Sequence, residues 1–254
     1  MSERADTEPG LPQIDTNEYG GKGPDGERQQ LDRRLFMQLL VFRSPADVSA
    51  ADSIGALSEL LGARSIASVL YADVNDPRGI GVLTWSEDPA HFVSGVRPAL
   101  AEPFARRLEL RPELTMLGRT YSSGHEPRLA WWLLEKPREN VLNESYPWAV
   151  WYPLRRTGAF AKLDPKEQSS ILREHAQIGF AYGKQGLAHD IRLACHGLDA
   201  SDNEFVIGLV GPSLHPLSHL VQAMRKTRQT SEFIAQMGPF FVGHAVWRSA
   251  GAAR

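Results

Sequence analysis

A single histidine stands in the best-formed helical pattern of the chain. Asp164 suits the N-cap of a helix, Pro165 its first position and Glu167 the place of a capping-box partner. Apolar residues and His175 then recur at the i, i+3, i+4 and i+7 spacing of one helix face over residues 171–182. The pattern predicts a helix whose imidazole emerges from an apolar stripe. There it can ligate a metal or be a hydrogen-bonded core histidine, and the helical position alone favours the core histidine.

Other reactive side chains fall on segments that are typical of strands. Tyr152 precedes Pro153, which keeps the backbone at Tyr152 extended, and alone it is typical of a half-buried strand aromatic. Asp190 and Arg192 lie two residues apart and therefore face the same side of a strand. A carboxylate can move a proton and a guanidinium can stabilise negative charge, although a structural ion pair fits the same pattern.

The apolar pattern predicts two sets of elements in the same order: strand, helix, strand, strand, helix, strand. The first set comprises residues 35–42, 44–62, 66–71, 80–85, a helix from 88 and a strand within 108–118. The second comprises residues 148–154, 164–182, 189–195, 204–210, 214–228 and 239–247. Each set has the βαββαβ order of a ferredoxin-like unit. We therefore predict an α+β fold in which two ferredoxin-like halves form one dimeric α+β barrel with helices outside.

The domain organisation follows from composition and element order. Residues 1–30 are rich in Gly, Pro, Asp, Glu and Gln and predict a flexible N-terminal tail or an arm lying on a neighbour. Residues 31–135 form the predicted N-terminal ferredoxin-like half, and residues 136–254 the C-terminal half. Turn and aromatic residues over 119–145 are interpreted as a connector between the two halves.

Composition limits the possible functions. The net charge of −2 gives no basic excess for nucleic-acid binding. No apolar run approaches the roughly 20 residues that span a bilayer, so we expect no membrane span. The N-terminus carries no apolar segment of a signal peptide. The single cysteine, Cys195, excludes an intrachain disulfide and a multi-cysteine zinc site. A cytoplasmic enzyme or binding protein is expected.

The second half resembles the chlorite dismutase family, which includes the coproheme decarboxylases of haem synthesis. Four segments carry the resemblance by their order and spacing: PWAVWYPLRR at 147–156, LDPKEQSSILREH at 163–175, HGLD at 196–199 and GPFFVG at 238–243. It covers roughly residues 138–243. The resemblance implies a dimeric-barrel fold that binds haem b or coproheme in its C-terminal half. It also implies a homo-oligomer, usually a pentamer.

The resemblance assigns roles to three residues. His175 falls at the position of the axial ligand to haem iron, which leaves the opposite face open to peroxide. A ligating histidine usually donates its other N–H to a carboxylate or carbonyl, and we expect a carboxylate from another element. Tyr152 falls at the radical-forming tyrosine of the decarboxylases, whose phenoxyl radical takes a hydrogen from a propionate. Arg138 falls near a decarboxylase arginine that holds a propionate.

Other positions of the expected haem site are ambiguous or depart from the family pattern. Arg155 and Arg156 follow the predicted strand and either clamp propionates through bidentate hydrogen bonds or form a solvated turn. Phe160 is what remains of the family's haem-pocket aromatics after this pair. The distal arginine of chlorite dismutases, or glutamine of many decarboxylases, falls on Asp190, with Arg192 on the same side of the strand. Neither known chemistry therefore transfers intact.

The leading hypothesis is a peroxide-dependent haem oxidoreductase similar to the coproheme decarboxylases. A chlorite dismutase is the first alternative, disfavoured because Asp190 replaces the expected arginine, and a general haem peroxidase is another. A haem-binding oligomer without turnover belongs to a different class, and a dimeric barrel without haem is the simplest alternative. The expected partner is a small-molecule oxidant such as peroxide or chlorite.

Overall fold

Antiparallel strands close into a ring in the computed structural model, which describes residues 11–250. Eight of the ten strands of the main sheet form the ring, each pairing with the next and the last with the first. Their order is β8 (Trp148–Arg156), β10 (Phe205–Gly211), β9 (His189–Ala194), β7 (Met116–Thr120), β3 (Phe36–Arg43), β5 (Gly79–Ser86), β4 (Ser68–Asp73) and β12 (Phe241–Arg248). The short strands β6 (Glu109–Leu110) and β11 (Ile234–Met237) pair with β3 and β8.

The ring consists of two ferredoxin-like halves, as predicted. The first half runs β3, α1 (Ala50–Ala63), β4, β5, the helical segments η1 (Phe92–Val96) and α2 (Arg97–Leu100), then β7. The second runs β8, α5 (Pro165–Lys184), β9, β10, α6 (Leu214–Met224), then β12. In each half the first strand lies between the third and fourth, and the halves meet where β7 pairs with β9 and β4 with β12. The sequence boundaries drawn between the halves stay a prediction.

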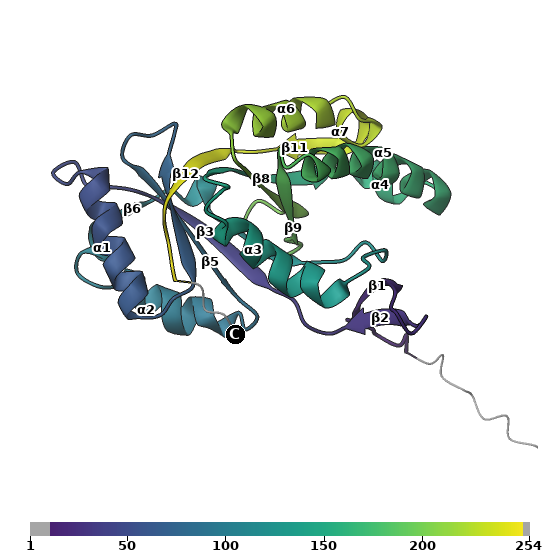
Figure 1. The fold of residues 1–254 in the computed structure, drawn as a ribbon, viewed down its shortest axis with the longest axis horizontal. Helices are drawn as coiled ribbons and strands as arrows, with labels where there is room; N and C mark the ends of the chain where they lie inside the picture. Colours follow the sequence, from purple (N-terminus) through teal and green to yellow (C-terminus); the bar gives the residue numbers. More distant parts are fainter. Residues whose placement is uncertain (1–10, 251–254) are drawn as a thin grey trace, which may run out of the picture.

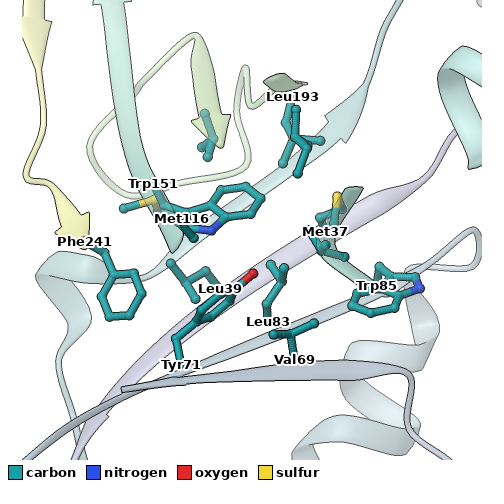
Figure 2. Close-up of a cluster of buried hydrophobic side chains, with 14 of the residues drawn as sticks. Met37, Leu39, Val69, Tyr71, Leu83, Trp85, Met116, Trp151, Leu193 and Phe241 are labelled. Carbon is teal, nitrogen blue, oxygen red and sulfur yellow. The ribbon is translucent and has the colours of Figure 1, made fainter. Parts of the chain in front are cut away.

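Side chains fill the inside of the barrel. Residues alternate between the two faces of each strand, so Met37 and Leu39 of β3 and Trp151 of β8 point inward and are almost fully buried (Figure 2). The Trp151 ring lies against Gly208, where an added Cβ would sit 2.6 Å from a ring carbon. The interior is therefore a packed core, and the predicted site residues Tyr152, Asp190 and Arg192 lie on the outer, helix-covered face.

Helix α5 begins where the sequence predicts. The Asp164 side chain accepts a hydrogen bond from the Lys166 backbone N–H at 2.8 Å, and Pro165 occupies the first turn. Glu167 does not complete the predicted capping box, because its carboxylate pairs instead with Arg228 at 2.8 Å. Arg228 belongs to α7 (Arg228–Phe233), so this ion pair ties the start of α5 to a neighbouring helix.

The segment predicted as an N-terminal tail, residues 1–30, contains secondary structure from residue 18 onward. Strands β1 (Glu18–Lys22) and β2 (Arg28–Leu31) form an antiparallel hairpin. The Gln29 side chain joins this hairpin to the loop after β7 by donating to the carbonyls of Glu126 and Pro127 and accepting from the Leu129 N–H. Hydrogen bonds rather than apolar burial hold this hairpin in place, so the composition of the segment did not predict its two strands. Residues 1–10 of the predicted tail lie outside the described residues.

The predicted connector contains helical structure. It contains η4 (Trp131–Glu135) and α3 (Lys136–Leu142). Outside the connector, the short helical segments are η2 (Ala105–Arg107), η3 (Pro112–Leu114) and α4 (Gly158–Ala161). Figure 1 shows α1 and α2 in one group and α4 to α7 in another, on the outside of the strands. None of the helices within residues 11–250 combines the length and apolar character needed to cross a membrane.

Candidate functional site

The outer face of β8, β10 and β9 brings three of the predicted site residues together. In the strand register, Ile207 of β10 pairs with Tyr152 on one side and with Arg192 on the other. Adjacent strands lie about 4.8 Å apart, so the Cα atoms of Tyr152 and Arg192 are about 10 Å apart. Asp190 stands two residues before Arg192 and faces the same way. The alternation within β9 therefore correctly predicted that Asp190 and Arg192 share a face.

His175 reaches this region from α5. Its Nδ1 atom lies 3.5 Å from the Thr227 hydroxyl, at the outer limit of a hydrogen bond. That hydroxyl donates to the Met224 carbonyl at 2.8 Å and is therefore an acceptor toward the imidazole. We infer an Nδ1–H tautomer, which leaves the lone pair of Nε2 free for another partner. The expected carboxylate partner is replaced by a threonine hydroxyl, so that prediction is wrong.

The charges on β9 act on this imidazole. Burial lowers the pKa of His175 below its usual value, the positive charge of Arg192 lowers it further, and the negative charge of Asp190 partly offsets both. Electrostatic effects of this kind require proximity. The His175 imidazole is consequently neutral at pH 7, the form in which a histidine nitrogen can bind a metal.

Helix α5 leaves its apolar stripe only half buried. Of its 20 residues, Ile171 alone is fully buried, while His175, Ile178 and Tyr182 are half-buried. The strands that face α5 also carry partly buried apolar side chains. Tyr152 is 5% exposed and stacks on Phe240 with ring centroids 4.6 Å apart. The partly buried apolar side chains around this layer are Trp148, Ile178, Tyr182, Phe205, Ile207, Leu214, Val221, Met224, Ile234, Met237, Phe240 and Val242.

A lysine that the sequence analysis missed lies at the edge of this face. The Lys136 ammonium group at the start of α3 is 2.8 Å from one carboxylate oxygen of Asp190, and the Arg192 Nε atom is 3.2 Å from the other. Burial raises the pKa of Asp190, but Lys136 and Arg192 outweigh it and lower the pKa to about 2. A small cavity is lined by Thr120, Tyr121, Trp132, Lys136, Pro137, Asp190, Ile191 and Arg192.

Arg138 does not join these residues. Its guanidinium binds Glu87 at 3.1 Å, at the end of β5. Residues two apart on a helix are about 200° apart around its axis, so the face of α3 that presents Lys136 to β9 turns Arg138 away. The expectation that Arg138 holds a propionate therefore stays a prediction.

The two arginines at the end of β8 also diverge. Both lie within the strand rather than in a turn after it, so their side chains point to opposite faces. Arg155 binds Gln236 of β11 at 3.2 Å. Arg156 binds Glu204 at 3.0 Å and lies 4.5 Å from the centroid of the Phe160 ring. Phe160 itself is buried at 4% exposure, so it supports Arg156 and does not line an open pocket.

His175 has no cluster of other metal-ligating side chains around it in the described part of the chain. Among residues 11–250, no three His, Cys, Asp or Glu side chains gather to hold a metal ion. A metal bound here would therefore need most of its ligands from another source.

A closed ring of two ferredoxin-like halves defines the class of dimeric α+β barrel proteins. In this barrel a histidine on a helix lies beside the outer face of the second half. The sequence pattern described as chlorite dismutase matches residues 113–246, more than half of the chain. The chain belongs to the chlorite dismutase family.

Solved structures have the same fold at low identity. A haem-binding protein from Thermus thermophilus is 18% identical with a TM-score of 0.63, covering 85% of this chain and 92% of that one. A variant of chlorite dismutase from Candidatus Nitrospira defluvii is 16% identical with a TM-score of 0.65 and the same coverage. The imidazole complex of that enzyme is 15% identical with a TM-score of 0.65, again with this coverage. No match is found among curated proteins.

Proposed function

We propose that the protein binds haem b or coproheme between α5 and the outer face of β8, β9 and β10, with His175 as the axial ligand. The observation that carries this proposal is the His175 imidazole on α5, whose Nδ1 contacts Thr227 and on which the charge of Arg192 acts. Its Nε2 makes no hydrogen bond with any of residues 11–250. Membership of the chlorite dismutase family and the fold shared with a haem-binding protein support it.

The residues of the site fit a porphyrin. A haem brings its own four in-plane nitrogen ligands, so one histidine suffices where no protein metal cluster exists among the described residues. The half-buried apolar side chains of α5 and the strands offer surfaces for a flat apolar ring. Arg156, on the same strand face as Tyr152, offers a cation to a propionate, and the guanidinium would then be shared between that propionate and Glu204.

The activity we favour is peroxide-dependent oxidative decarboxylation of coproheme. Each propionic acid group and one hydrogen peroxide give a vinyl group, carbon dioxide and two molecules of water, which balances atoms and electrons. Bound haem supplies the redox chemistry with peroxide. Burial raises the pKa of Tyr152, so its phenol keeps its proton at neutral pH. Tyr152 is proposed to lose that hydrogen atom and then take one from the propionate side chain.

The ligand proposal is tested by titrating the purified protein with haem b and with coproheme. We expect a Soret band in the wild type and its loss or strong weakening in His175→Ala. His215→Ala is the matched control, because His215 lies exposed on α6. An identical Soret spectrum and affinity in His175→Ala would exclude the proposed ligand.

The activity is tested by adding peroxide to the coproheme complex and following porphyrin mass. We expect loss of carbon dioxide and two hydrogen atoms per propionate in the wild type, and none in Tyr152→Phe. Tyr19→Phe, in the hairpin, should behave as wild type. A Soret band without any mass change would reduce the protein to a haem binder or general peroxidase. Oxygen release from chlorite would instead select chlorite decomposition.

Assembly into a homo-oligomer, a pentamer by family resemblance, is part of the same proposal. Apolar side chains on the outer surface of α5 support it: Phe180 is 73% exposed and Leu172 41%. Light scattering on the purified protein gives the subunit number, and a monomer at micromolar concentration would contradict this part.

A further inference from the structure

Four charged side chains from three segments meet beside the proposed haem site: Glu126 of the loop after β7, Lys136 of α3, and Asp190 and Arg192 of β9. Glu126 is satisfied largely by its own loop. Its carboxylate accepts hydrogen bonds from the N–H and hydroxyl of Ser123 and from the N–H groups of residues 124 and 125, at 2.7–3.1 Å. Arg192 approaches it only to 3.8 Å. Glu126 is ionised, because its pKa is lowered, and it balances one of the two cations. It stays the same in every variant considered below, so differences in charge between those variants come from the other three residues.

Lys136 raises the charge of the cluster by one unit. Asp190 and Arg192 alone form a neutral pair, and Lys136 makes the group of three cationic. Lys136 is not a mobile surface lysine, since its side chain is 14% exposed and its Nζ atom lies 3.8 Å from the centroid of the Trp132 ring. Asn140, one turn later in α3, donates to the Asp190 carbonyl at 3.3 Å and fixes the helix against β9.

Arg192 retains a donor for a ligand. Its Nε atom is within ion-pair distance of Asp190, yet among the described residues it makes no well-aligned hydrogen bond and is buried. The guanidinium also lies 4.6 Å from the centroid of the Trp132 ring, which restricts its movement. A buried N–H without a partner is unfavourable, and an incoming anion can relieve that cost.

We propose that Lys136 is a positioning residue that holds Asp190 away from full pairing with Arg192 and makes the site selective for small anions over neutral ligands. The inference rests on the proposed function, because the anion would bind at the open face of the haem. The same cationic character stabilises negative charge that develops on an oxygen of a small oxidant. In this role Asp190 anchors two cations and does not serve as the proton-transferring carboxylate considered from the sequence.

The test compares azide with neutral imidazole as ligands of the haem-loaded protein, both followed by the Soret shift. The group of three has a net charge of +1 in the wild type and in Lys136→Arg, 0 in Lys136→Gln and +2 in Asp190→Asn. One unit charge at roughly 8 Å and an effective dielectric constant of about 20–40 changes anion affinity roughly five- to thirtyfold. We expect azide affinity to fall by that factor in Lys136→Gln and to rise in Asp190→Asn, with imidazole affinity unchanged.

The double variant Lys136→Gln/Asp190→Asn separates charge from structure. It restores a net charge of +1, so we expect azide affinity to return to within about threefold of the wild type. A merely structural Lys136 predicts that the double variant is no better than the single one, and that azide and imidazole weaken together. Either result would overturn the inference. A missing Soret band in the wild type would instead overturn the proposed function.

Discussion

Helix α1 covers the outer face of the first half with Leu57 and Leu61 at 0% exposure, whereas the longer α5 covers the corresponding face of the second half with Ile171 alone fully buried. The strand residues beneath explain the difference. In the first half the outward positions include Phe42, Leu70, Ile80 and Val82. In the second half they include Tyr152, Asp190 and Arg192.

One topology thus serves two purposes. An apolar strand face can be closed by an apolar helix, and the burial stabilises the fold. Covering a carboxylate and a guanidinium with an apolar helix would cost a large desolvation free energy. Helix α5 therefore packs less tightly on this face, and other charged side chains pair with the two groups. The first half therefore contributes mainly to stability, and the second half carries the candidate site.

The largest expected effect is a stability difference between the two helices. Leu57→Ala removes a fully buried side chain from α1 and should cost about 2–5 kcal/mol of unfolding free energy, because it leaves a cavity. Leu172→Ala on α5 removes a side chain that is 41% exposed and should cost less than about 1 kcal/mol. Urea unfolding monitored by circular dichroism measures both. Equal costs would contradict the comparison.

Haem binding should reduce the difference in stability between α5 and α1. If haem covers the half-buried apolar face of α5, free haem at a hundredfold excess over its dissociation constant stabilises the protein by about 2.7 kcal/mol. Amide hydrogen exchange through local opening of α5 should then slow by up to about a hundredfold, while exchange through local opening of α1 stays the same. His175→Ala is the control and should show no such protection. Equal slowing in both helices would indicate global stabilisation and no special role for α5.

The sequence predicted the architecture because its signals are local. Alternating apolar residues mark the inward and outward faces of each strand, and the N-cap at Asp164 with the spacing that follows marks the helix of His175. The same alternation was enough to predict that Asp190 and Arg192 share one face of a strand.

What the sequence could not predict depends on contacts between distant residues. Lys136 meets Asp190 across 54 positions, and Thr227 meets His175 across 52. Neither residue belongs to a motif that announces such a partner. The direction of Arg156 was missed for another reason: β8 continues two residues beyond the predicted end of the strand, and strand ends are poorly marked in sequence.

Removing the hydroxyl beside His175 should affect the second half alone. Thr227→Val keeps the volume of a side chain that is 1% exposed but deletes the acceptor for the imidazole N–H. Partners of a ligating histidine are typically worth ten- to a hundredfold in metal affinity, roughly 1.4–2.8 kcal/mol. We expect haem affinity to fall by that range in Thr227→Val. Thr227→Ser keeps the hydroxyl and should stay within about threefold of the wild type, and equal loss in both variants would exclude the contact as the cause.

The smallest expected effect is the acid dependence of the charged group around Asp190. Because the folded-state pKa is about 2, below the usual value near 3.9, this carboxylate stabilises the fold above pH 4 and loses that contribution as the pH falls toward 2. The side chain is 39% exposed, so solvent screening leaves about 1 kcal/mol of the effect. The gap in unfolding free energy between wild type and Asp190→Asn should shrink by that amount between pH 5 and pH 2.5.

Other groups near Asp190 could imitate this acid dependence and have to be separated from it. Glu126 titrates in the acid range, and its pKa is also lowered, but Asp190→Asn leaves it in place. The pKa of His175 and of His189 is lowered by burial, but both histidines are also present in Asp190→Asn and therefore titrate in both proteins. Lys136→Gln removes the nearer cation and should reduce the acid dependence, whereas Lys136→Arg should preserve it. An acid dependence that is the same in Lys136→Gln as in the wild type would show that Arg192 alone holds the carboxylate, because only the lysine differs between the two proteins.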